Sequence, residues 1–119
     1  MNLPAPVLER LRLIGEDLVR TTLEHFDNAV VFHRSLHLLS DPSRASFREG
    51  RRKYRRLFEQ LLRDGIASGE VRPDLQVDLA SFNYFGAIGY LTVWYSPEGE
   101  RTVDEIARGF GDLLIASIT

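Results

Sequence analysis

The chain has 119 residues, of which 44% are hydrophobic and 27% charged; this is the composition of one globular domain and excludes a disordered or fibrous protein. Fifteen basic against seventeen acidic residues give a net charge of -2, so no overall positive field attracts nucleic acid. The absence of cysteine excludes disulfides, thiolate metal ligands and cysteine nucleophiles.

The N-terminal third predicts two helices. Apolar residues recur at intervals of three and four over residues 6–24 and again over residues 28–39, which is typical of one helix face. In the first segment they are Leu8, Leu11, Ile14 and Leu18. In the second they are Val30, Val31, Phe32, Leu36 and Leu39. Asp27 or Asn28 can cap the second helix by accepting hydrogen bonds from its first amides.

A long helix is predicted over residues 43–67. Pro42 marks its start, because proline disfavours the helical conformation of the residue before it, and Ser40 or Asp41 can cap the new helix. Gly69 marks its end, since glycine readily takes the left-handed conformation found just after a helix. The apolar positions are Phe47, Tyr54, Leu57, Phe58, Leu61, Leu62 and Ile66.

The segment 76–95 is predicted to form a helix without a wide polar stripe. Its apolar residues are Val77, Leu79, Ala80, Phe82, Tyr84, Phe85, Ala87, Ile88, Tyr90, Leu91, Val93, Trp94 and Tyr95. A helix that is apolar all round must be covered all round, and in so small a domain one face can meet the core. We therefore expect the other face to contact something outside the monomer.

The last predicted helix covers residues 103–117. It opens on the sequence TVDE at residues 102–105, which is an S/T-x-x-E capping box. Val103, Ile106, Ala107, Phe110, Leu114 and Ile118 share one face. No strand pattern competes, so we expect an all-α fold of about five helices in a single domain over residues 1–119.

His33 and His37 are four residues apart in a predicted helix, so both imidazoles could reach one metal ion. The third ligand is the difficulty, because Asp41 continues the stripe but lies at the Pro42 break, and no HExxH pattern exists. We therefore expect surface or pocket histidines and no metal site.

One basic run stands out, formed by Arg48, Arg51, Arg52, Lys53, Arg55 and Arg56. These side chains spread around most of a helix, which favours a solvated face. The alternative is local attraction of an anionic ligand, such as one carrying phosphates, by guanidinium groups. Binding of duplex DNA is less favoured in a slightly acidic chain. The segment TVDEIARGF at 102–110 superficially resembles the first helix of a helix-turn-helix, but the apolar residues after it cannot supply a polar recognition helix.

Gly86 and Gly89 lie inside a predicted helix, where each costs about 1 kcal/mol relative to alanine. They indicate either close helix packing or a hollow beside a ligand. The neighbouring aromatic residues belong either to the core or to an apolar ligand cavity. They are Tyr84, Phe85, Tyr90, Trp94 and Tyr95.

These features together resemble a known family. The long helix is followed by GEVRPD at 69–74, GAIGYLTVWY at 86–95, then Pro97, Gly99 and a Thr-capped helix. This order is similar to the C-terminal ligand-binding and dimerisation domain of TetR-family transcriptional repressors, in particular the branch that senses fatty-acyl or sterol-derived acyl-CoA thioesters. Family members often carry Asn and Trp where this chain has Gly89 and Tyr90.

The resemblance implies a cytoplasmic homodimer in which the last two helices of each protomer build a four-helix bundle. The residues that we assign to this interface are Tyr84, Leu91, Ile106, Phe110 and Leu114. It also implies that the chain has no catalytic activity and binds no cofactor. DNA binding is expected only through a helix-turn-helix domain, which this chain lacks. No apolar run reaches the roughly 18 residues of a membrane helix, so no membrane partner is expected.

The resemblance also implies a pocket for a small apolar or acyl-CoA-type effector. We assign its wall to Phe32, Leu36, Tyr54, Phe58, Phe85, Gly89 and Trp94. The charged head of the effector is expected near Arg51, Arg52 and Arg55, because guanidinium groups hold phosphates well. The alternative function is a stand-alone helical interaction module that dimerises without any small molecule.

Overall fold

The computed structural model describes residues 6–24 and 41–119, and within the second range it describes side chains at 49, 50 and from 52 onward. These ranges contain four helices and no strand: α1 (Val7–Glu24), α3 (Asp41–Ser68), α4 (Val77–Trp94) and α5 (Val103–Ile118). The all-α prediction is confirmed, and the observed helix ends lie within two residues of the predicted ones. The helix predicted over 28–39 lies outside the described residues, as do His33 and His37.

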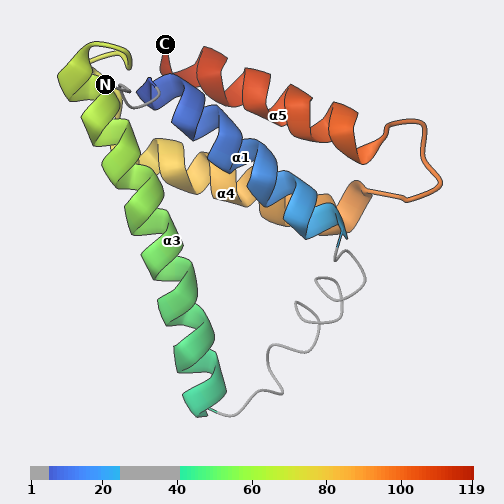
Figure 1. Cartoon of the computed structure of the whole chain (residues 1–119). Helices are drawn as coiled ribbons and strands as arrows, with labels where there is room; N and C mark the ends of the chain where they lie inside the picture. Colours follow the sequence, from blue (N-terminus) through green and yellow to red (C-terminus); the bar gives the residue numbers. More distant parts are fainter. Residues whose placement is uncertain (1–5, 25–40) are drawn as a thin grey trace, which may run out of the picture.

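Helix α1 lies at the centre of the arrangement (Figure 1). Helix α5 runs antiparallel along one side of it, as the pairing of Arg12 with Asp112 and of Arg20 with Asp104 requires. Helix α4 passes on another side, and α3 crosses at a steep angle so that its N-terminal half projects away from the other helices (Figure 1). The C-terminal half of α3 therefore supplies the contacts with α1 and α4.

The core forms where the apolar stripes of the four helices meet around α1. Leu11 and Val19 of α1 are fully buried, eight residues apart on one face. Leu23 of α1 is also buried, and the other buried apolar residues come from the remaining helices and from the turn after α3. They include Phe58, Leu61, Leu62, Val71, Tyr84, Ile88, Leu91, Ile106, Ala107, Leu114 and Ile118.

Local signals in the sequence position the ends of these helices. Gly69 has φ +82°, the left-handed conformation predicted to end α3. The amides of Glu70 and Val71 both donate to the carbonyl of Gly65, and the amide of Arg72 donates to the carbonyl of Ile118 at 2.9 Å, which ties this turn to the end of α5. At the start of α5, Thr102 and Glu105 form the predicted capping box with both hydrogen bonds present.

Candidate functional site

Four aromatic side chains form a cluster between α3 and α4, and it contains three of the predicted pocket residues. The ring of Tyr54 lies 6.2 Å from that of Phe85 in an edge-to-face arrangement, and the ring of Phe58 lies 5.3 Å from it. Tyr84 completes the cluster, with its ring 5.5 Å from Phe58. Tyr54 and Phe58 meet the same part of α4 because residues four apart share a helix face.

The two tyrosine hydroxyls in this cluster are poorly solvated. Burial raises the pKa of Tyr54 above its ordinary value, and the negative charge of Asp17 adds to this effect. Burial likewise raises the pKa of Tyr84, with smaller effects from Glu16 and Tyr54. The hydroxyl of Tyr84 has no hydrogen-bond partner among the described residues. Both tyrosines are therefore neutral at physiological pH.

Arg55 lies at the edge of the aromatic cluster, on the α4 side of α3. Its guanidinium carbon is 5.0 Å from the centre of the Phe82 ring, which is within the range of a cation–π contact. Its Nε is 3.6 Å from Oε1 of Glu59, a carboxylate that is itself buried. Arg52 is exposed one turn earlier, and the side chain of Arg51 lies outside the described part. The structure thus brings one of the three predicted cationic groups to the aromatic cluster.

The other predicted pocket residues are more scattered. Gly89 is half-buried, and no atom of the described residues occupies the space that a side chain would fill there. Trp94 is 47% exposed at the C-terminal end of α4, nine residues beyond Phe85. At about 1.5 Å per residue it is roughly 13 Å along the helix from Phe85 and outside the cluster. Phe32 and Leu36 lie outside the described residues.

An open hollow of about 290 Å³ lies between α4 and α5. Three residues assigned to the dimer interface line it, namely Tyr84, Phe110 and Leu114. Its other lining residues are Ala80, Asn83, Ala87, Leu113 and Ser117. A second, more polar hollow adjoins it and shares three of these residues.

The interface assignment needs a correction at four positions. Leu91 and Ile106 are 0% and 4% exposed, and Leu114 and Tyr84 are 5% and 6% exposed, because all four pack into the core of the protomer. Tyr84 and Leu114 reach a second copy only through the hollow that they line, and Phe110 is the one assigned residue that is half-buried. The large apolar residues that do face outward on α4 and α5 are Leu79, Phe82, Tyr90, Val93, Trp94 and Leu113.

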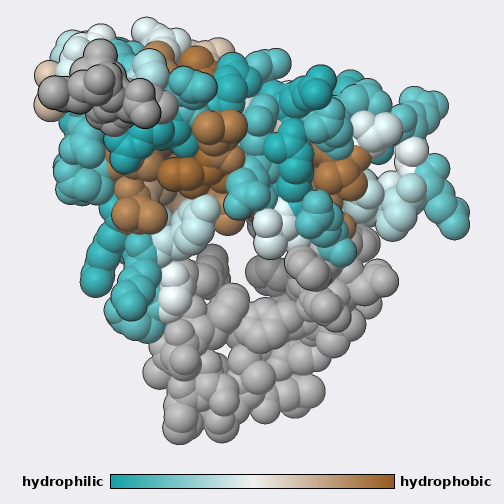
Figure 2. Space-filling view, in the orientation of Figure 1, coloured by the Kyte–Doolittle hydropathy of each residue, from teal (hydrophilic) through white to brown (hydrophobic). Residues whose placement is uncertain are grey.

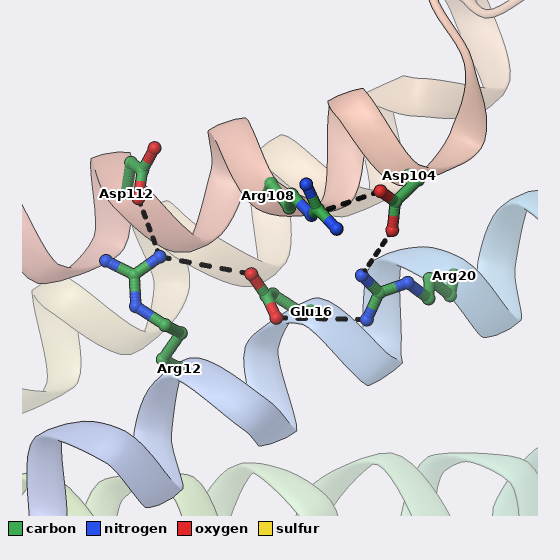
Figure 3. A network of polar contacts seen from close by, with 6 residues as sticks. All are labelled: Arg12, Glu16, Arg20, Asp104, Arg108 and Asp112. Atoms are coloured by element: carbon green, nitrogen blue, oxygen red, sulfur yellow. Dashed lines mark hydrogen bonds and ion pairs between the residues drawn. The ribbon is translucent and has the colours of Figure 1, made fainter.

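A ladder of alternating charges joins α1 to α5 (Figure 3). Arg12 donates to Asp112 at 2.6 Å, and Arg20 donates to Asp104 at 2.7 Å. Between these two arginines lies the buried carboxylate of Glu16, with guanidinium nitrogens at 3.9 and 3.8 Å. Arg108 extends the ladder with a 3.0 Å contact to Asp104. These ion pairs set the register of α5 relative to α1.

The sequence analysis missed this ladder, although a signal was present. Arg12, Glu16 and Arg20 are spaced four apart with alternating sign, and so are Asp104, Arg108 and Asp112. Such spacing supports a helix on its own. Only the packing shows that the two series face each other. Figure 2 shows the resulting surface, in which hydrophobic residues gather near the crossing of α1 and α3 and hydrophilic residues cover much of α5.

The ladder predicts a pH dependence of stability. The hydrogen bond from Arg20 holds the pKa of Asp104 below its ordinary value of 3.8. A carboxylate whose pKa is lowered by folding stabilises the fold above its unfolded pKa, and this contribution disappears as the pH falls toward the folded pKa. We expect the difference in Tm between wild type and Asp104→Asn to shrink as the pH is lowered from about 6 to about 3. Glu100→Gln, in the exposed loop before α5, is the control, and a difference that stays constant with pH would contradict the prediction.

Other site classes find no support in the described part of the chain. Within residues 6–24 and 41–119, no three His, Asp or Glu side chains lie close enough together to hold a metal ion. Among these helices, none is both long and apolar enough to cross a membrane. The aromatic cluster with Arg55 and the α4–α5 face with its hollow are thus the two candidate sites.

Comparison with known proteins gives consistent matches over almost the whole chain. The model of a family described as "Tetracyclin repressor-like, C-terminal domain" matches residues 4–118. The HTH-type transcriptional repressor KstR2 of Mycobacterium tuberculosis is 28% identical over 114 residues, which are 94% of this chain and 56% of that protein. Its counterpart in Mycolicibacterium smegmatis is 29% identical over 92 residues, covering 76% of this chain and 44% of its own length.

Two solved structures share the fold. The ketosteroid transcriptional regulator KstR2 of M. tuberculosis superimposes with a TM-score of 0.87 at 25% identity, over 98% of this chain and 60% of that one. A TetR/AcrR-family transcriptional regulator of Thermobifida fusca gives 0.83 at 27% identity, over 95% and 59%. The chain therefore spans about half the length of the curated relatives that it matches.

Proposed function

The chain belongs to the tetracyclin repressor-like C-terminal domain family, and on this basis we propose that it senses an apolar effector and dimerises within a TetR-like transcriptional regulator. Ligand binding and dimerisation are the general roles of this domain in the family. The relatives are transcriptional repressors, which agrees with the expectation that the chain is not an enzyme. The observation that carries the proposal is the outer face of α4, which leaves large apolar side chains uncovered beside a hollow.

The dimer proposal starts from this outer face. Leu79, Phe82, Tyr90 and Val93 are each at least half exposed on a helix whose opposite face is buried. Leu113 of α5 is 68% exposed beside the hollow. A monomer seldom leaves a patch of this kind in contact with water, because covering it is favourable by about 25 cal/mol per Å². A second copy of the same face, forming a four-helix bundle, would cover it.

Small residues on α4 support this arrangement. Gly86 and Ala87 are exposed midway along the helix, and no described atom lies where a side chain on Gly86 would be. Packing inside the protomer therefore does not explain why α4 keeps a glycine that weakens the helix. An approaching helix backbone of a second copy would use this space.

We assign the effector site to the aromatic cluster. Tyr54, Phe58 and Phe85 supply a wall of apolar rings, and Gly89 supplies the gap next to it. Arg55 at the edge of the cluster is placed to meet a negatively charged group. Such an arrangement suits an apolar acyl or sterol-type group attached to a phosphate-bearing carrier, in line with the word "ketosteroid" in the description of one relative. Phe32, Leu36, Trp94, Arg51 and Arg52 remain part of this proposal.

The rest of the regulator is proposed from the relatives. Both are HTH-type repressors, and each is about twice as long as its matched part. We therefore assign operator binding to a helix-turn-helix domain of the regulator. This chain contributes to operator binding only by dimerising. We place the regulator in the cytoplasm.

Calorimetry with a panel of fatty-acyl and sterol-type CoA esters tests the effector site. We expect at least one ester to bind, Gly89→Phe to abolish binding by filling the gap, and Arg55→Ala to weaken it in a salt-dependent way, because a charge-assisted contact is lost. Arg101→Ala, in the exposed loop between α4 and α5, is the matched control and is expected to bind as wild type does. The absence of heat and of any thermal shift with every ester would favour the interaction module that dimerises without a small molecule.

A further inference from the structure

Tyr84 contacts α3 and α1 and lies beside α5. Its ring lies 5.5 Å from that of Phe58 on α3. Its hydroxyl oxygen is 2.5 Å from the point where a Cβ on Gly15 of α1 would be. A methyl carbon of Leu114 on α5 lies 3.2 Å from the same point. Tyr84 therefore reaches from the aromatic cluster of the proposed effector site to the place where α1, α4 and α5 meet.

The same side chain also borders the proposed dimer face. Tyr84 and Leu114 both line the hollow between α4 and α5. Because interiors are close-packed, a ring that moves at the aromatic cluster displaces the groups that its far end touches. Tyr84 is itself part of the wall of the hollow, so a shift of its ring changes that wall.

The hydroxyl of Tyr84 is buried without a hydrogen-bond partner among the described residues. A buried hydroxyl without a partner is unfavourable, and a phenylalanine would fill most of the same space without that cost. Filling space therefore does not explain why a tyrosine, and not a phenylalanine, occupies this position.

We propose that Tyr84 is the positioning residue that couples the effector site to the dimer face, an inference that rests on the proposed function. An apolar group entering beside Phe58 and Phe85 shifts the Tyr84 ring. The hydroxyl end of the ring then moves away from Gly15, and the wall of the hollow that Tyr84 and Leu114 share is rearranged. Effector binding thereby favours one of two packed arrangements of these side chains. The dimer dissociation constant depends on the equilibrium between the same two arrangements.

The first experiment needs neither an effector nor a dimer. Phe58→Leu perturbs the aromatic cluster, and methyl NMR of Leu114 reports whether the perturbation reaches α5. We expect the Leu114 resonances to shift in the wild-type background and to shift by less than half as much in a Tyr84→Phe background. Ser81→Ala is the matched control, because it removes another buried hydroxyl without a hydrogen-bond partner from α4, and it is expected to leave the response unchanged. An equal response in the Tyr84→Phe background would overturn the proposal.

The second experiment measures the coupling itself by sedimentation with palmitoyl-CoA and choloyl-CoA as probes. We expect a thioester to change the dimer dissociation constant at least about fivefold in wild type and in Ser81→Ala, and less than about twofold in Tyr84→Phe. Thioester binding measured by calorimetry is expected to persist in Tyr84→Phe. Coupling that survives in this variant would overturn the proposal. A wild-type chain that binds no thioester, or forms no dimer, would contradict the proposed function, and the NMR experiment would then decide on Tyr84 alone.

Discussion

Replacing Leu113 with glutamate is expected to leave the protomer folded and to raise the dimer dissociation constant by more than about 100-fold. Leu113 is 68% exposed on α5, so a charge there is solvated in the monomer. In a dimer that covers this face, the same charge would be buried without a partner, which costs about 3 kcal/mol or more. Sedimentation at several concentrations gives the dissociation constant, and circular dichroism shows whether the helices persist.

Two variants make this result specific. Leu13→Glu adds the same charge to an equally accessible leucine on α1, which is 56% exposed, and it is expected to leave dimerisation unchanged. Leu114→Glu changes the next residue of α5, which is 5% exposed in the core, and it is expected to unfold the chain. The interface proposal fails if Leu113→Glu sediments as wild type does, or if the wild type is a folded monomer at micromolar concentration.

Replacing Gly15 with alanine is expected to destabilise the fold by about 2 to 3 kcal/mol, since an added methyl group overpacks a tight contact. The new Cβ would lie 2.5 Å from the hydroxyl oxygen of Tyr84 and 3.2 Å from a methyl carbon of Leu114. Both neighbours are buried, so a shift of either one disturbs the packing around it. Thermal unfolding should show a fall in Tm of roughly 8 to 12 °C.

The identity of the clashing group can be tested by rescue. Adding Tyr84→Phe to Gly15→Ala removes the nearest atom and is expected to restore at least half of the lost stability. Gly50→Ala serves as the control, because Gly50 is exposed within α3 and no described atom lies within 4 Å of its missing Cβ. That variant should be slightly more stable than wild type, since alanine favours the helix. A double variant as unstable as Gly15→Ala would show that the hydroxyl is not the obstacle.

Helix ends were predictable from the sequence because the groups that determine them are neighbours along the chain. The capping box at Thr102 and Glu105 and the left-handed Gly69 both satisfy backbone groups within a few residues. The same holds for the pairing of Tyr54 and Phe58 on one helix face. The unusual character of α4 was also visible, because a helix without a polar stripe can be recognised from composition alone.

The candidate sites were only partly predictable. The aromatic cluster brings Tyr54, Phe58 and Phe85 together as expected, whereas Trp94 lies outside it. Leu91 and Leu113 are the same type of residue. Leu91 is nevertheless fully buried within the protomer, whereas Leu113 is mostly exposed at the proposed interface. Hydrophobicity did not separate them, because it does not say which neighbour covers a residue.

The sequence by itself determined the helices, their ends and the excess of apolar surface on α4. The tertiary structure alone decided which apolar residues are covered within the protomer, that the two charge series of α1 and α5 form one ladder, and that Tyr84 and Leu114 both lie against Gly15. The physical reason is the range of the interactions. Helix formation depends on hydrogen bonds and side-chain contacts within about four residues, which the sequence states directly. Packing depends on the crossing of helices, which brings together residues such as Gly15 and Leu114 that are far apart along the chain.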